Sequence, residues 1–189
     1  MTAYGVLRQI STPSITTLNL AITLSGSSLQ DLFEFLDHSS QNLIKLSINI
    51  VGDFEHTGLT AILQKIPSLE SLAILHHSGT RQALDEVFER LNVNVNSTSD
   101  SPIILKLQKI QLRLGLPALN WGVFLDMCDS RQQWSDTSIN GSENNILTAK
   151  LQTITLHLTD GARSGLSSND LDRIAEMRGK NCLIEIRRM

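Results

Sequence analysis

The sequence contains a small group of histidines near a carboxylate, and these residue types bind transition metals. His76 and His77 are adjacent, and Asp53 and His56 lie earlier in the chain. Structural zinc sites pair Cys or His ligands at short fixed spacings, and catalytic zinc helices carry a His-Glu-x-x-His motif. Neither spacing occurs here. We therefore predict ordinary surface histidines, with no metal and no other cofactor.

A second candidate for chemistry is the run Asp126-Met127-Cys128-Asp129, which places a thiol between two carboxylates. Paired carboxylates perform general acid–base catalysis, and a thiolate is a nucleophile. The run continues a helical pattern whose apolar face includes Trp121 and Phe124. On such a helix Cys128 is expected to be a buried small side chain, and the carboxylates are expected to be solvated surface charges. We predict no catalytic residues.

The elements that position these residues belong to a repeat. The pattern Leu-x-x-Leu-x-Leu, with Ile accepted at each position, occurs as Ile15–Leu20, Leu43–Ile48, Leu69–Ile74, Leu107–Leu112 and Leu151–Leu156. The repeats therefore start near residues 15, 43, 69, 107 and 151. The first two spacings fall within the roughly 20 to 29 residues typical of leucine-rich repeats. The later two are longer, which indicates insertions.

Each repeat combines a strand pattern with a helix pattern. Residues 46–50 and 154–158 alternate apolar and polar side chains, which is typical of a half-buried strand. Between the strands the period becomes helical, as in Leu59, Ile62, Leu63 and Ile66. Further helices are expected over 29–36, 84–91, 121–128 and 171–178, the last opened by a capping box of Ser167 and Asp170, and a terminal strand is expected near 183.

Strands that alternate with helices favour parallel pairing through right-handed crossovers. We therefore predict an α/β fold, an open leucine-rich-repeat solenoid of the ribonuclease-inhibitor-like variety, with a parallel sheet on the concave side and helices on the convex side. The rival, a doubly wound sheet, normally carries a Gly-rich turn after its first strand, and the sequence has none there. The whole chain, 1–189, is expected to form one domain, with mobile insertions at 92–100 and 129–145.

Composition narrows the class of partner. The formal net charge is -3 and no basic stripe is visible, so we expect neither nucleic acid nor a membrane as a ligand. The two cysteines, Cys128 and Cys182, lie far apart among apolar residues, which favours reduced thiols over a disulfide framework. A cytoplasmic or nuclear location is the resulting expectation.

The last repeats carry a more specific likeness. The strand 107–114, the helical run Phe124-Leu-Asp-Met-Cys-Asp-Ser-Arg-Gln-Gln-Trp134 and the strand 151–158 follow one another across a low-complexity loop. In this order the chain resembles the leucine-rich-repeat region of fungal, mushroom-type F-box-like proteins. The resemblance implies the substrate-binding part of a ubiquitin-ligase adaptor. Residues 1–13 contain no Leu-Pro opening of an F-box, so Skp1 and cullin are expected as partners only if an F-box is supplied.

The concave side is where a solenoid of this kind binds its ligand, because alternate strand residues point outward there. The residues predicted to bind a partner protein are Lys45, Asn49, Lys109, Gln111, Arg113, Thr155 and His157. This face is mildly basic, which favours an acidic segment of another protein. Two alternatives stay open. One is a regulator of an enzyme such as a GTPase, acting through Arg81 or Arg163, and the other is a remnant with no independent function.

Overall fold

The computed structural model describes residues 14–22, 27–50, 56–76, 81–93, 103–115, 119–133, 149–163 and 165–188. Six strands form one sheet in chain order, and every neighbouring pair is parallel. The strands are β1 (Thr17–Ile22), β2 (Lys45–Ile50), β3 (Ser71–His76), β4 (Lys109–Leu114), β5 (Thr153–Leu158) and β6 (Leu183–Arg188). The predicted α/β class with an all-parallel sheet is confirmed.

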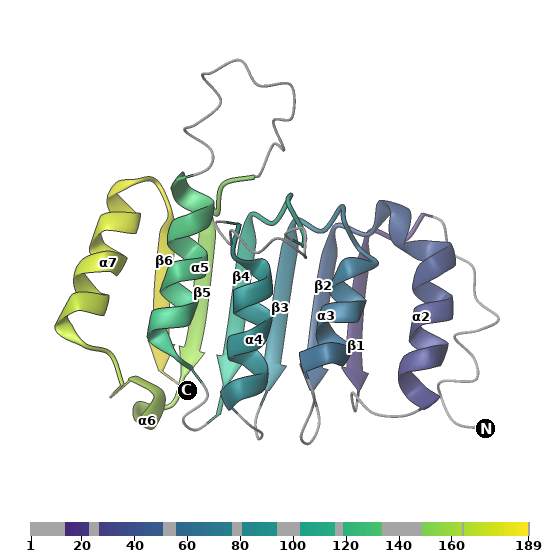
Figure 1. The fold of residues 1–189 in the computed structure, drawn as a ribbon, viewed down its shortest axis with the longest axis horizontal. Coiled ribbons are helices and arrows are strands. Elements are labelled where there is room, and N and C mark those ends of the chain that lie inside the picture. The colour runs from purple at the N-terminus through teal and green to yellow at the C-terminus, as the bar shows by residue number, and fades with distance from the viewer. Residues whose placement is uncertain are drawn as a thin grey trace, which may run out of the picture.

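The helices form a second layer. They are α2 (Ser27–Ser39), α3 (His56–Gln64), α4 (Arg81–Leu91), α5 (Trp121–Gln133), the single turn α6 (Asp160–Arg163) and α7 (Ser168–Gly179), with a 3₁₀ turn η1 (Ser40–Asn42) after α2. Consecutive long helices contact one another, so α2, α3, α4, α5 and α7 stand side by side over the sheet (Figure 1). The arrangement is consistent with a solenoid-like α/β fold. Neither η1 nor α6 was predicted, because segments this short carry no period.

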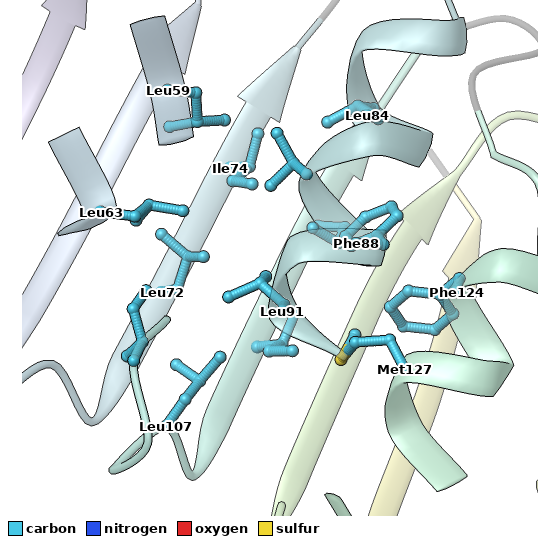
Figure 2. Close-up of a cluster of buried hydrophobic side chains, with 14 of the residues drawn as sticks. Leu59, Leu63, Leu72, Ile74, Leu84, Phe88, Leu91, Leu107, Phe124 and Met127 are labelled. Atoms are coloured by element: carbon cyan, nitrogen blue, oxygen red, sulfur yellow. The ribbon is translucent and has the colours of Figure 1, made fainter. Parts of the chain in front are cut away.

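The core lies between the two layers. The three aliphatic positions of each repeat point toward the helices, and Ile48, Ile74 and Leu112, at equivalent positions of neighbouring strands, are fully buried. Leu59 and Leu63 of α3, and Leu84, Phe88 and Leu91 of α4, pack onto these strands (Figure 2). Full burial of one such side chain stabilises the fold by about 1.5–3 kcal/mol relative to leaving it exposed. The hydrophobic pattern seen in the sequence is therefore the contact surface between sheet and helices.

Each repeat enters its strand in the same way. The backbone N–H groups of Ile44 and Lys45 both donate to the Thr16 carbonyl, each at 3.0 Å. The same shared acceptor recurs at Ile44 for residues 70 and 71, at Glu70 for residues 108 and 109, and at Gln108 for residues 152 and 153. Side chains at equivalent positions of successive repeats therefore align across the sheet.

The long α5 changes the predicted boundary of one insertion. The helix runs through Gln133, so residues 129–133 belong to it, whereas the sequence predicted an insertion over 129–145. Ser130, Arg131 and Gln132 are also buried. Val93, at the start of the insertion predicted over 92–100, is buried, and its N–H donates to Ser130 Oγ at 3.2 Å. The remainders of both predicted insertions, 94–100 and 134–145, lie outside the described residues.

The predicted capping box at the start of α7 is confirmed. The backbone N–H of Asp170 donates to Ser167 Oγ at 3.2 Å, and the N–H of Ser167 donates to Asp170 Oδ2 at 2.9 Å. The side-chain and backbone hydrogen bonds from Ser167 lower the pKa of Asp170 below its usual value. The cap therefore couples helix stability to the charge of Asp170.

Replacing Ser167 with alanine is expected to lower the free energy of unfolding by about 1 kcal/mol at neutral pH. A carboxylate whose pKa is depressed in the folded state stabilises it above the unfolded pKa, and this stabilisation is lost as pH falls through the folded pKa. Urea unfolding at neutral and acidic pH should therefore show the largest difference from wild type at neutral pH. Ser168→Ala, an exposed neighbour, is the control. An equal loss in both variants would contradict the assigned cap.

Candidate functional site

The sheet has a face that no described helix covers, and we call it the open face. It consists of three rows of alternate strand residues, which the parallel register aligns. The first row is Thr17, Lys45, Ser71, Lys109, Thr153 and Leu183. The second row is Asn19, Ser47, Ala73, Gln111, Thr155 and Glu185, and the third row is Ala21, Asn49, Leu75, Arg113, His157 and Arg187.

All seven residues predicted to bind a partner lie on the open face. Lys45 and Lys109 belong to the first row, and the others belong to the second and third rows: Gln111, Thr155, Asn49, Arg113 and His157. Lys45, Lys109, Gln111 and Arg113 are exposed, and the remaining three are half-buried. The structure thus brings the seven side chains, from strands β2, β4 and β5, onto one surface.

Leu183 belongs to this face although the sequence did not assign it a place there. It pairs with Thr153 in the first row, and it is 56% exposed. The terminal strand lacks the Leu-x-x-Leu-x-Leu pattern, so its register could not be deduced from the repeat. The sole signal was the alternation of residues 183–187, which leaves the pairing partner undefined.

Some charged side chains of the open face form ion pairs with one another, and others do not. Glu185, the one carboxylate among the three rows, receives an ion pair from Arg187 at 2.5 Å. The side chains of Lys45 and Lys109 are exposed, and neither forms a hydrogen bond or ion pair with another described residue. Their ammonium groups are therefore the charges on this face that are free to bind an anionic ligand.

Asn49 supplies an unsatisfied polar atom in the third row. Its Oδ1 is buried and has no hydrogen-bond partner. Its register neighbours are Ala21 and Leu75, whose side chains cannot donate. Buried polar atoms are normally hydrogen-bonded, so this oxygen is an acceptor left without a donor.

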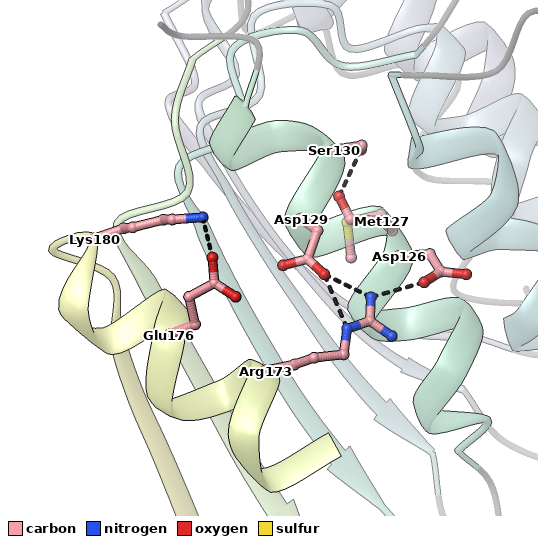
Figure 3. Close-up of polar contacts among 7 residues, drawn as sticks. All are labelled: Asp126, Met127, Asp129, Ser130, Arg173, Glu176 and Lys180. Atoms are coloured by element: carbon pink, nitrogen blue, oxygen red, sulfur yellow. Dashed lines mark hydrogen bonds and ion pairs between the residues drawn. The ribbon is translucent and has the colours of Figure 1, made fainter. Parts of the chain in front are cut away.

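The two carboxylates considered for catalysis lie on the helix side and share one arginine (Figure 3). Arg173 of α7 donates through Nη2 to Asp126 Oδ1 at 2.7 Å and to Asp129 Oδ2 at 2.6 Å. Burial lowers the pKa of Arg173, but the hydrogen bonds with Asp129 and Asp126 outweigh it, so that pKa is raised. The cluster tethers α5 to α7.

Cys128, the candidate nucleophile, is fully buried, as predicted. Burial raises its pKa well above the usual value, and the nearby Cys182 raises it further. Burial likewise raises the pKa of Cys182 to about 11. Both thiols are therefore protonated at neutral pH. The regulator alternative requires Arg81 and Arg163 to lie in loops, but the structure places them at the first residue of α4 and the last residue of α6. Asp53 and His77 of the histidine group lie outside the described residues.

Comparison with known proteins adds no family assignment. The chain matches no protein-family model, no curated protein and no solved structure. None of the described helices is both long enough and apolar enough to cross a membrane. In the same described part of the chain, no three His, Cys, Asp or Glu side chains group closely enough to hold a metal ion.

Proposed function

We propose that this chain is a leucine-rich-repeat recognition module that binds another protein through the open face of its sheet and performs no chemistry. The observation that carries the proposal is the three-row open face, which offers polar and basic side chains from all six strands on one surface. The repeated shared-carbonyl hydrogen bonds support the repeat character. Such a rigid, extended surface suits protein recognition.

The resemblance to mushroom-type F-box-like proteins supports a narrower proposal. The chain would then be the substrate-binding part of a ubiquitin-ligase adaptor. Co-purification of Skp1 and cullin with the tagged chain from its source cells would support this adaptor role. Their absence, with other partners recovered at the open face, would leave a recognition module without the ligase connection.

The test of the recognition function is site-specific photo-crosslinking in cells. A photoreactive residue is placed at Gln111, exposed in the second row, or at Glu89, exposed on α4 in the helix layer. We expect the Gln111 variant to capture a defined partner protein that the Glu89 variant does not capture. Equal capture at the two positions would contradict recognition through the open face.

A further inference from the structure

We propose that the ligand of the open face is an acidic polypeptide segment, held by the paired ammonium groups of Lys45 and Lys109 on either side of Ser71. This inference rests on the proposed function, because it names the class of partner for the same surface. It commits to carboxylate side chains of another protein as the occupant.

The register fixes the spacing of the two lysines. Lys45 pairs with Ser71, and Ser71 pairs with Lys109, so the lysines occupy the same row with one strand between them. Adjacent strands are separated by about 4.8 Å, which places the two lysine backbones about 10 Å apart. Ser71, between them, offers a hydroxyl and no bulk. Two carboxylates of one segment that crosses the strands can therefore bind at the same time.

Both lysines have their charge available. Both side chains are exposed, and among the residues that the structure describes neither forms an ion pair, whereas the carboxylate of the open face, Glu185, lies on β6 and is already bound to Arg187. An incoming carboxylate therefore displaces no ion pair at either lysine. Most of its binding energy is retained, because no existing contact has to be broken first.

The opposite side of the molecule has the opposite charge. Helices α2, α3, α4, α5 and α7 together contain eleven Asp and Glu residues and five Arg residues. The three rows of the open face contain four Lys and Arg residues and one Glu. An acidic segment is therefore repelled by the helix layer and attracted to the open face, which orients its approach.

The uncharged residues of the open face favour a polypeptide over a nucleic acid. No Phe, Tyr or Trp side chain occurs in the three rows, and the stacking groups of nucleic-acid sites are reduced to His157 and the two arginines of the third row. Ser47, Ala73 and Gln111 in the second row are small or flexible and flank the lysine pair. Ser47 and Ala73 leave room for a main chain, and the side chains of Ser47 and Gln111 can hydrogen-bond its peptide groups.

The experiment combines the Gln111 photo-crosslinker with three further changes in the full chain. Lys45→Gln/Lys109→Gln removes the proposed contacts. Lys106→Gln/Lys180→Gln removes the same number of charges from two exposed lysines outside the rows and is the matched control. Ala73→Trp blocks the centre of the open face by bulk. A Glu-rich synthetic peptide and its Gln-substituted counterpart serve as competitors, and circular dichroism verifies that each variant is folded.

We expect Lys45→Gln/Lys109→Gln to reduce crosslinking roughly tenfold, as two exposed charge contacts warrant, and the control to leave it unchanged. The Glu-rich peptide should compete, and its Gln counterpart should not. Loss of crosslinking with Ala73→Trp but not with Lys45→Gln/Lys109→Gln would overturn the acidic ligand and leave the recognition function standing. Unchanged crosslinking in all variants would contradict the recognition function itself.

Discussion

Replacing Arg131 with methionine is expected to lower the free energy of unfolding by about 4 kcal/mol, because three buried carbonyl groups lose their donors. The Arg131 side chain is fully buried. Its Nε donates to the Leu91 carbonyl at 2.9 Å, Nη1 to the Ile104 carbonyl at 3.0 Å and Nη2 to the Ile103 carbonyl at 3.1 Å. Burial lowers the pKa of Arg131 to about 10, so the side chain remains a cation at neutral pH.

Urea unfolding followed by circular dichroism measures this loss, and Arg188→Met is the matched control. Arg188 is 69% exposed and pairs with Asp160, so its replacement should cost at most about 1 kcal/mol. Arg131→Lys keeps a positive charge but has fewer hydrogen-bond donors, so its free energy of unfolding should lie between those of Arg131→Met and Arg188→Met. This variant can still be measured if Arg131→Met does not fold. Equal stability of the Arg131→Met and Arg188→Met proteins would show that the carbonyls find other donors.

Replacing Phe88 with alanine is expected to lower the free energy of unfolding by about 4 kcal/mol, because removal of a buried aromatic ring leaves a cavity that the neighbouring elements fill only in part. Phe88 of α4 is 1% exposed, and its ring meets that of Phe124 on α5 edge to face, with centroids 5.2 Å apart. The substitution therefore removes a buried ring from the core between the sheet and the helices, and with it the ring contact between two neighbouring helices. Thermal and urea unfolding should both record the loss.

Phe33→Ala tests whether the effect depends on burial. Phe33 of α2 is half-buried and lies near Lys65 Nζ, which is 5.6 Å from its ring centroid. Its replacement should lower the free energy of unfolding by roughly half as much as Phe88→Ala, or less. In a double-mutant cycle, Phe88→Leu and Phe124→Leu should show a coupling of about 1 kcal/mol. Additive effects would mean that the two rings stabilise the fold independently of each other.

Most of the sheet could be predicted from the sequence, because the aliphatic pattern that forms each strand is repeated along the chain. In each of the first five strands the same aliphatic positions face the helices, so one register satisfies all of them and aligns the rows that contain Lys45 and Lys109. The open face follows from that register by alternation alone. The terminal strand lacks the repeat motif, so the position of Leu183 was not predictable in the same way.

The polar end of α5 shows where sequence reasoning fails. Ser130-Arg131-Gln132 reads as a surface loop by composition, yet all three side chains are buried. Ser130 Oγ donates to the Met127 carbonyl at 2.8 Å, and Gln132 Nε2 donates to the Leu151 carbonyl at 2.6 Å. Polar groups can be buried when they satisfy backbone groups of neighbouring repeats. Ser130 Oγ also accepts from the N–H of Val93, 37 residues away, and the acceptor of Gln132 is 19 residues away, so no local sequence pattern predicts these contacts.

The ion-pair cluster around Arg173 illustrates the same limit. Asp126 and Asp129 are adjacent on one helix surface, a spacing that suits acid–base chemistry as well as it suits a structural contact. Arg173 lies 44 residues beyond Asp129 in the sequence. Only the packing of α7 against α5 decides between the two interpretations, and it favours a tether between helices.

The order of the strands in the sheet is the order of the strands in the chain, and this has an evolutionary consequence. Because each strand and helix packs chiefly on its neighbours, a duplicated strand–helix unit could be inserted in the gene without disturbing distant contacts. One additional unit would widen the sheet by about 4.8 Å. The size of the open face can therefore evolve in steps, and descendants of one ancestor can differ in the width of this surface.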